Sequence, residues 1–464
     1  MKLQQSMIRQ KAVFLFEKYF TGNTMDYRQV FGIIAPILAD SAFIVMMSLL
    51  NTAMISSSGV AAVSAVSMVD SLNIFIVNVF IALATGGTVI VAQYKGSGND
   101  QMVSRSASQA ITLVTLAAIA VSAVFIIFHN ATLTLLFGQA EPDVFANARI
   151  YLIGSCLTFP FLAVYQAVTG VLRGVGETKP CLVLSIIMNF TCFLLNVLFI
   201  TILDLDVVGL VISLLLARML GMGTALIYLL KYNHTLCVKI RDTLHIDFSI
   251  CKKIMYIGIP FAAEQLFFNG GKLLTQTFIV MFGTLALTTN AISSSLSMLF
   301  QVGSSSLSVA IVTVVGQCIG RNDIQDARKF IKSFMGLSVI LFILAAALIL
   351  PLFPLIVQLF SPPEEIIPDI FDLTLLIAVA QPVLWTVSFI IPAALRAAGD
   401  SKYTSVTSLL TMWLVRVVLG YVLGVMLEFG LMGVWAAMVI EWGVRGVLFA
   451  WRFKGDKWYR HRLI

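Results

Sequence analysis

The chain has 464 residues, of which 59% are hydrophobic and only 11% are charged, and its formal net charge is +7. A soluble core of this size could not hide so much apolar surface, so a soluble globular protein is excluded and the chain must be solvated by lipid. The excess of positive charge serves to orient the chain in a membrane, and no other feature supports a nucleic-acid partner.

Long apolar stretches recur along the chain, and a helix needs about twenty such residues to cross the hydrocarbon layer. Their hydrophobicity does not alternate as it does in the strands of an outer-membrane barrel. We therefore predict an all-α polytopic membrane protein with about twelve transmembrane helices. The expected spans are 29–56, 62–94, 104–128, 145–172, 178–203, 207–231, 254–282, 285–318, 327–353, 365–395, 403–426 and 430–452.

The spans group into two lobes with short flanking segments. Residues 1–28 carry several charges and one apolar cluster that is too short for a signal peptide, so we expect a cytoplasmic amphipathic arm. Residues 29–231 are predicted to form an N-terminal six-helix lobe, and residues 254–452 a C-terminal one. The predicted remainder is a cytoplasmic linker at 232–253 and a basic cytoplasmic tail at 453–464.

Lysine and arginine concentrate in every second connection between the spans. Because these residues are retained on the cytoplasmic side, we predict that both termini are cytoplasmic and that the protein lies in the cell (inner) membrane. The basic connections contain Lys95 and Arg105, Arg173 and Lys179, Lys231 to Lys253, Arg321 to Lys332, Arg396 and Lys402, and Arg452 to Arg462.

Cysteine and histidine residues do not suggest a metal, redox or catalytic centre. The six cysteines are scattered without ligand spacing, so neither a disulfide framework nor a zinc site is expected. The four histidines fall in loops or at helix ends, which argues against a proton relay across the membrane. No cofactor is expected, and the one metal considered is a sodium ion bound by acidic residues.

The chain repeats itself. Pro36 and Asp40 return as Pro260 and Glu264, and both separations, 260 minus 36 and 264 minus 40, are 224 residues. The run LRGVGETK at 172–179 returns as LRAAGDSK at 395–402, with a separation of 223. Gly59, Gln93 and Gly96 likewise return as Gly283, Gln317 and Gly320. Six helices in each half make the copies parallel repeats, an architecture known in transporters.

In the order and symmetry of these features the chain resembles the multidrug and toxic compound extrusion (MATE) family of the MOP flippase superfamily. The resemblance implies a secondary active antiporter that exports drugs or metabolites in exchange for protons or sodium ions. It is carried by Pro36 with Asn51-Thr52, the GGTVIVAQYKG run from Gly86 to Gly96, the LRGVGETK and LRAAGDSK pair, and Trp413 with Arg416.

Asp40 and Glu264 are the main candidates for coupling cation and substrate. Each lies about eleven residues into its predicted helix, which is about 16 Å and close to the bilayer midplane. An ionisable group at that depth costs at least a few kcal/mol, so it usually faces a cavity and is functional. The alternative is a buried carboxylate bound to a polar neighbour that only joins helices.

Pro36 and Pro260 are the hinge candidates, because each precedes an acidic residue by one helical turn. Proline removes a backbone hydrogen bond and lets a helix bend. Loading the nearby carboxylate with a proton or sodium ion could then select another helix conformation. The alternative is that both are ordinary prolines of membrane helices.

Helical geometry adds candidates for a cavity wall. Positions eleven residues apart return to within about 20° of the same direction. Asn51 therefore shares the face of Asp40, and Thr275 that of Glu264. The same stripes carry Met47 and Gly271.

The family pattern contributes further cavity-lining candidates. Its usual Asn and Asp pair in helix five is represented here by Asn189 and Asn196, and the helix-ten acid of sodium-type relatives falls near Trp385. Asp70, near the outer end of helix two, is either a cavity residue or a solvated capping group. The family often has an acid at the position of Asn51, so this chain departs from its pattern.

The remaining charged residues are interpreted as structural. Lys272, two turns beyond Glu264, is expected to form an ion pair with Glu264 or with the other lobe. In LRGVGETK and LRAAGDSK, glycine is expected to end a helix while the basic side chains reach cytosolic head groups. Packing or salt-bridge roles are assigned to Arg218, Arg416, Glu441 and Arg445.

The resulting hypothesis is export of an amphipathic, cationic small molecule from a cavity between the lobes, by alternating access. Asp40 and Glu264 would bind substrate and coupling cation competitively. One alternative is a flippase for lipid-linked saccharides, which should line its cavity with several Arg or Lys residues. Another is a membrane-embedded enzyme, for which no catalytic constellation is visible. The expected partners are a small-molecule substrate and membrane lipid, and the expected state is a monomer.

Overall fold

A computed structural model describes residues 14, 16–55, 60–138, 141–238, 242–243, 245–461 and 463–464. Parts of the predicted arm (1–13 and 15) and of the predicted linker (239–241 and 244) lie outside the described residues. Across the described ranges the chain is helical and contains no strand. The predicted all-α fold class is confirmed.

The first half of the chain forms long helices in the predicted order. A short helix, α5, follows the third span and was not predicted. The elements are α2 (Tyr27–Ile55), α3 (Val60–Gly96), α4 (Asp100–Ile127), α5 (His129–Phe137), α6 (Pro142–Val175), α7 (Thr178–Asn196) with η2 (Val197–Ile202), and α8 (Asp206–Ile227) with η3 (Tyr228–Tyr232).

The second half repeats this plan, but its last helices contain wide, π-type turns. These turns interrupt the predicted spans 365–395 and 403–426. The elements are α10 (Phe248–Met281), α11 (Thr284–Gly320), α12 (Ile324–Gln358), η4 (Glu364–Ile366), α13 (Ile367–Ala380), η5 (Gln381–Trp385), α14 (Thr386–Ala397), α15 (Ser401–Leu410), η6 (Thr411–Val417), α16 (Val418–Tyr421), η7 (Val422–Met426), α17 (Gly430–Lys454) and η8 (Lys457–Tyr459).

Eleven helical segments in the described ranges are long and apolar enough to cross a membrane. Helix α10 is a twelfth segment of similar length, with 34 residues, but it falls outside that group. Its middle carries Glu264, Gln265, Asn269 and Lys272, which lower its hydropathy. Helix α10 contains one of the two predicted coupling acids, and α2, which contains the other, belongs to the apolar group.

The chain divides into two compact units, and the divisions fall inside helices. One unit contains residues 35–262, and the other contains residues 1–34 and 263–464. Helices α2 and α10 each belong partly to one unit and partly to the other. Both divisions lie within two residues of a predicted hinge proline, Pro36 or Pro260. The unit boundaries thus differ from the linker boundary that marks the two halves of the sequence.

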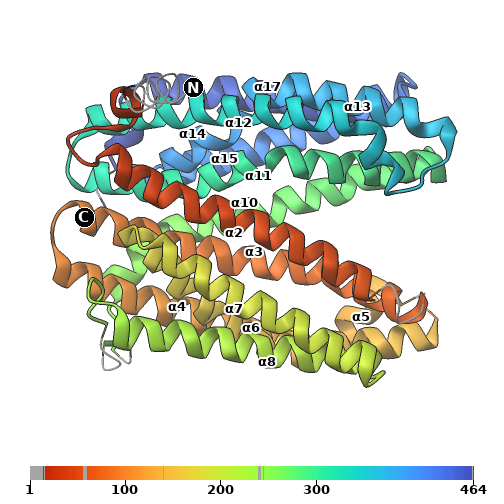
Figure 1. Ribbon diagram of the computed structural model, residues 1–464, viewed down its shortest axis with the longest axis horizontal. Coiled ribbons are helices and arrows are strands. Elements are labelled where there is room, and N and C mark those ends of the chain that lie inside the picture. Colours follow the sequence, from red (N-terminus) through yellow and green to blue (C-terminus); the bar gives the residue numbers. More distant parts are fainter. Residues whose placement is uncertain are drawn as a thin grey trace, which may run out of the picture. The chain divides into compact units, whose positions relative to one another are not determined.

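Small residues such as Gly86 and Gly87 let the helices of the 35–262 unit approach closely. A Cβ atom added at Gly86 would lie 2.6 Å from the carbonyl oxygen of Ile254 in α10, and one at Gly87 would lie 2.5 Å from Ala110 in α4. Helices α6, α7 and α8 of this unit run side by side (Figure 1). Within this bundle α3 packs against both α4 and α6.

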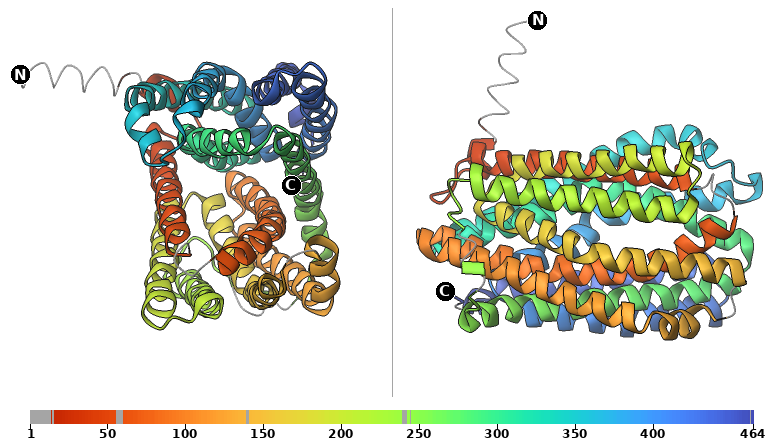
Figure 2. Two further views of the ribbon diagram at one scale, coloured as in Figure 1. Left: turned by 90° about the vertical axis from the view of Figure 1, so that its right-hand side faces the viewer. Right: turned by 90° about the horizontal axis from the view of Figure 1, so that it is seen from below.

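The other unit is built around aromatic residues. Phe300, Phe342, Trp385, Trp435 and Trp442 belong to one buried cluster that joins α11, α12, η5 and α17. The turned views of Figure 2 show the long helices of this unit, drawn in green-blue to blue, lying along one another. The tail returns to α12, where Arg328 pairs with Asp456 at 2.9 Å.

The segments before α2 and α10 are held by polar contacts within their own units. In one unit, Ser333 of α12 donates a hydrogen bond of 2.6 Å to the carbonyl of Tyr19, and the Thr24 N–H donates one to Asp326. In the other, Gln109 of α4 donates to the linker carbonyls of Asp242 and His245. The end of the predicted arm, at Tyr19 and Thr24, therefore contacts α12.

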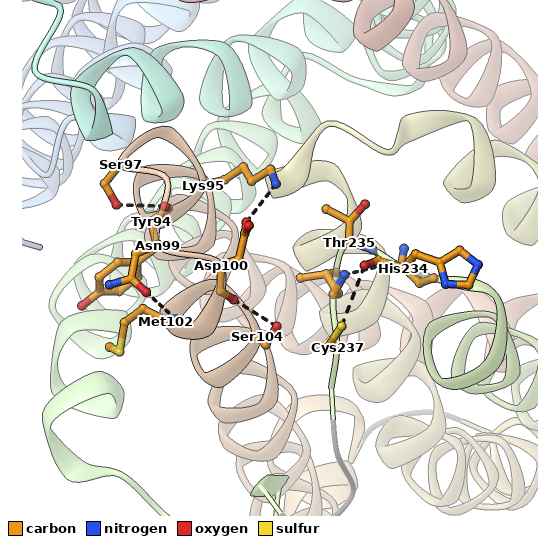
Figure 3. A network of polar contacts seen from close by, with 12 residues as sticks. Tyr94, Lys95, Ser97, Asn99, Asp100, Met102, Ser104, His234, Thr235 and Cys237 are labelled. Carbon is orange, nitrogen blue, oxygen red and sulfur yellow. Dashed lines mark hydrogen bonds and ion pairs between the residues drawn. The ribbon is translucent and has the colours of Figure 1, made fainter.

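Near the linker, Lys95 at the end of α3 and Asp100 at the start of α4 form an ion pair of 3.1 Å. Figure 3 shows this pair beside the linker residues His234, Thr235 and Cys237. The linker therefore lies over the end of α3 and the start of α4.

Candidate functional site

Asp40 forms a buried ion pair with an arginine of its own unit. Its Oδ2 atom accepts a hydrogen bond of 3.2 Å from Arg173, and the carboxyl side chain is 6% exposed. Arg173 lies in the last turn of α6. The carboxylate is therefore held near one end of α6, in contact with a guanidinium group, and does not stand alone in an open cavity.

Glu264 repeats this arrangement in the other unit. Arg396 donates hydrogen bonds of 3.3 and 3.2 Å to Oε1 and Oε2, and Ser405 donates a third, of 3.0 Å, to Oε2. The two side chains of the pair are 11% and 9% exposed. Arg396 lies in the last turn of α14, as Arg173 does in α6. Each predicted acid thus meets an arginine from the repeated LRxxG motif.

The same backbone motif presents both arginines. The helix ends at Gly176 and Gly399 have φ angles of 92° and 98°, which suit glycine. In both motifs the glycine N–H bonds to the carbonyl of the arginine at 2.9 Å, so the helix closes directly after it. Glycine therefore ends the helices as predicted. The prediction that Arg173 and Arg396 extend to lipid head groups is wrong.

The acidic residue of each motif accepts hydrogen bonds from side chains at the end of the last helix of the same half. Glu177 accepts hydrogen bonds from Tyr228 at 3.2 Å and from Asn233 at 2.5 Å. Asp400 accepts bonds of 2.7 and 3.2 Å from Arg452. The motif is therefore a structural anchor as well as the support for an arginine.

The two carboxylates differ in how fully they are bonded. Asp40 Oδ1 is buried and has no hydrogen-bond partner among the described residues. The Ser185 hydroxyl lies close enough to influence the charge of this carboxyl group, but the two do not form a hydrogen bond of normal distance and angle. Both Glu264 oxygens are bonded. Asp40 therefore offers an acceptor position to a proton or a small cation that Glu264 does not.

The predicted asparagines of the 35–262 unit form two links, one of them beside the Asp40 carboxyl group. Asn189 donates to the Ser185 hydroxyl at 3.2 Å, which connects Asn189 to the surroundings of Asp40. Asn196 donates to Asn51 Oδ1 at 3.1 Å. Met47 is buried on the same helix as Asp40.

Asp70 belongs to a separate polar cluster. Its Oδ1 atom accepts hydrogen bonds from Tyr151 at 2.7 Å and from Asn73 at 3.2 Å. Arg218 acts electrostatically on Asp70 and hydrogen-bonds to Thr158. These contacts join α3, α6 and α8, so Asp70 is bonded within the helix bundle.

The second unit, formed by residues 1–34 and 263–464, contains a cavity of about 420 Å³ among α10, α11, α14, α17, η5 and η6. Two predicted residues, Thr275 and Trp385, lie on its wall. Gly271 lies against Met412, where an added Cβ would approach to 2.7 Å, and is not among the wall residues. The wall also includes Lys272, Arg416, Trp435 and Trp442.

The charged residues behind this cavity differ partly from their prediction. Glu441 and Arg445 form the predicted i, i+4 ion pair at 3.2 Å. Arg445 also lies over the ring of Phe389 at 4.3 Å. Glu264 is bonded to Arg396, and Lys272 instead lies 5.1 Å from the ring of Phe268. The expected ion pair between Lys272 and Glu264 is therefore wrong.

The cavity residues Lys272 and Arg416 were not identified from the sequence as site residues. Arg416 lies on the π-type turn η6, and Trp385 lies on η5. Such turns often occur at functional sites, because they rotate side chains out of the regular helical register. The described residues contain no group of three or more His, Cys, Asp or Glu side chains that could hold a metal ion.

Comparison with known families gives one match that occurs twice. The pattern of the family described as MatE matches residues 36–202 and 260–422. The two matches begin at Pro36 and Pro260, the equivalent positions of the internal repeat.

Full-length relatives are found among curated bacterial proteins. The "Uncharacterized transporter YisQ" of Bacillus subtilis is 27% identical over 441 residues, which cover 92% of this chain and 94% of that protein. The "Probable multidrug resistance protein NorM" of Thermotoga maritima is 23% identical over 445 residues and covers 94% of each chain.

Solved structures share the fold. One is described as the outward-facing conformation of a multidrug resistance MATE family transporter of the MOP superfamily, with a TM-score of 0.84 and 17% identity. Another is a MOP superfamily transporter from Pyrococcus furiosus, for which reverse polarity of the binding pocket is said to suggest a different function, and it has the same TM-score and identity. Each match covers 92% of this chain and 95% of the other.

Proposed function

The chain belongs to the MatE family of membrane transporters, and from this premise we propose that it is a secondary active antiporter that exports amphipathic small molecules in exchange for H⁺ or Na⁺. It is a multi-pass membrane protein and a transporter, not an enzyme. The observation that carries the proposal is the buried acid–arginine pair that occurs once in each half. Relatives named as multidrug resistance proteins support the direction of export.

Asp40 is the proposed main coupling residue. An intramembrane carboxylate with one oxygen unbonded can take up a proton or a sodium ion at that oxygen. Neutralising the carboxylate would weaken its attraction to Arg173. Glu264 is the second coupling candidate, and its three hydrogen bonds would have to be broken first.

Pro36 and Pro260 are the proposed hinges. Each lies one turn before the acid of its helix and within two residues of a division between compact units. A change in charge at Asp40 would therefore act next to a position where α2 lacks a backbone hydrogen bond. Bending there would give the two conformations that alternating access requires.

The proposed placement follows the pattern of basic residues. We propose the cell (inner) membrane, with both termini cytoplasmic, and a monomer. No cofactor is proposed besides the coupling ion.

A lipid-linked saccharide flippase is the second candidate, and the cavity of the second unit favours it in one respect. Such a protein should present cationic side chains to a diphosphate, and the cavity wall carries Lys272 and Arg416. The volume of about 420 Å³ suits a small molecule better than a long glycolipid head group.

Proteoliposomes with imposed gradients test the proposed function. We expect efflux of amphipathic compounds to be driven by an inward proton or sodium gradient and to stop when that gradient is removed. The panel should include aromatic anions, cationic dyes and neutral analogues, since the charge of the cargo is not assumed. Equal transport with and without both gradients would contradict antiport.

A further inference from the structure

We propose that the cavity of the second unit binds an amphipathic aromatic anion, with its carboxylate between Lys272 and Arg416 and its ring among the tryptophans. The inference rests on the proposed function, because it names the class of cargo that such a transporter would carry. It also reverses the charge expected for the cargo from the sequence.

The charges on the wall are of one sign. Lys272 and Arg416 are cationic, and the described wall residues include no aspartate or glutamate. Neither cation forms an ion pair with a described residue. Unpaired charges at membrane depth are costly, so an anionic ligand would stabilise both.

The nearest acid does not neutralise this pair. Glu441 acts on both Lys272 and Arg416, but its Oε1 atom is bonded to Arg445 at 3.2 Å and to Thr411 at 3.3 Å. With Arg445 included, three cationic groups share one carboxylate. The cavity therefore retains an excess of positive charge that only a ligand or dissolved ions can balance.

The hydrogen-bonding groups on the wall also favour an acceptor ligand. Asn290 Oδ1 already accepts a bond of 3.0 Å from Trp435, and Gln276 Oε1 accepts one of 3.2 Å from Asn290. Ser297 Oγ accepts from Gln301 at 2.9 Å. The acceptors are thus largely occupied.

Donors, in contrast, remain available. The buried Trp442 Nε1–H has no partner among the described residues, and the ammonium of Lys272 and the guanidinium of Arg416 have no carboxylate partner there. A carboxylate supplies the acceptors that these donors lack.

The remaining wall suits an aromatic ring. Trp385 stacks on Phe389, with ring centroids 4.4 Å apart at an interplanar angle of 18°. Trp435 and Trp442 lie on the same wall. Flat aromatic surfaces bind planar rings well, and about 420 Å³ lies within the usual range of small-molecule sites, about 300–1,000 Å³.

Equilibrium binding of radiolabelled 1-naphthoate to the full chain in nanodiscs tests the proposal. We expect saturable binding that unlabelled 1-naphthoate displaces and that 1-naphthylmethylammonium, of similar size and opposite charge, does not. Lys272→Met and Arg416→Met should each weaken binding about tenfold or more. Lys272→Arg and Arg416→Lys should weaken binding less than the methionine variants do, because both retain the charge.

Lys332→Met is the matched control, because Lys332 is exposed on α12 of the same unit and outside the cavity. It should bind 1-naphthoate like the unmodified chain. If the methionine variants do not fold, the unmodified protein decides the question. In that case 1-naphthoate must raise its thermal unfolding midpoint and the ammonium analogue must not.

Three results would overturn the proposal. They are unchanged affinity in both methionine variants, displacement by the ammonium analogue as effective as by unlabelled naphthoate, and tighter competition by a polyprenyl diphosphate than by naphthoate. The last would identify a phosphate lipid as the ligand. Naphthoate binding without gradient-driven export would reject the proposed function alone. Gradient-driven export of cationic dyes without naphthoate binding would reject this inference alone.

Discussion

The two halves of the chain contain the same acid–arginine pair but bond it differently. Glu264 is one methylene longer than Asp40, and both of its oxygens reach Arg396 while Ser405 adds a third bond. Asp40 reaches Arg173 through one oxygen and leaves the other unbonded. The arginine of the less fully bonded pair is also the more exposed one, with 24% of the Arg173 side chain exposed and 11% of the Arg396 side chain.

This difference predicts that the two ion pairs have different roles. A buried carboxylate that accepts three hydrogen bonds holds its helices together, and a coupling cation must displace one of those bonds to reach it. An incompletely bonded carboxylate can exchange a proton or a cation at lower cost. We therefore expect Glu264 to contribute more to stability and Asp40 more to coupling.

Arg396→Met should give the largest loss of stability. It leaves Glu264 buried without its guanidinium partner, and breaking such a pair costs about 3–5 kcal/mol. The free energy of unfolding can be measured by SDS titration in mixed micelles. Arg396→Met combined with Glu264→Met should recover most of the loss, because no charge then stays unpaired. A single variant as stable as the unmodified protein would contradict the assigned role.

Arg173→Met should cost less, about 1–3 kcal/mol, because Arg173 is 24% exposed against 11% for Arg396, and it bonds one oxygen of Asp40 where Arg396 bonds both oxygens of Glu264. The same SDS titration measures it beside Arg396→Met. A loss equal to or greater than that of Arg396→Met would show that the two pairs are bonded equally well, and the comparison would fail.

Ser405→Ala should remove one of the three hydrogen bonds to Glu264 and leave the two from Arg396. It removes the bond of 3.0 Å to Oε2, at a cost of about 1 kcal/mol. Ser405→Thr keeps a hydroxyl group and is the matched control. If alanine and threonine have the same effect on the free energy of unfolding, the hydroxyl does not support the carboxylate.

Lys179→Gln should have the smallest effect, within about 0.5 kcal/mol. Lys179 is exposed in the same motif as Arg173 and keeps the surface role that was predicted for both. A loss as large as that of Arg173→Met would show that the motif acts through its net charge and not through the ion pair.

The fold class and the acidic member of each ion pair can be predicted from the sequence. Apolar stretches of spanning length predict the helices, and the constant offset of 224 residues identifies Pro36, Asp40, Pro260 and Glu264 without a structure. Their partners are 133 and 132 residues away, and nothing local distinguishes a paired arginine from one at the membrane surface. The repeated acid-to-arginine separation was a usable signal.

The cavity of the second unit could not be predicted from the sequence, for a different reason. Its wall combines residues from several helices and two π-type turns. A regular 3.6-residue period does not predict the rotation of Trp385 and Arg416 that such turns produce. Lys272 was visible as an intramembrane cation, but its surroundings depend on tertiary packing.

Ion-driven accumulation in proteoliposomes, compared for Asp40→Asn and Glu264→Gln at equal protein content, tests the central claim most directly. We expect Asp40→Asn to lower gradient-driven accumulation at least about fivefold, which corresponds to the smallest coupling free energies that are usual between two sites. Exchange of substrate without a gradient should persist. Glu264→Gln should retain most of the driven accumulation once its lower stability is allowed for. Driven accumulation by Asp40→Asn at the level of the unmodified protein would contradict the account.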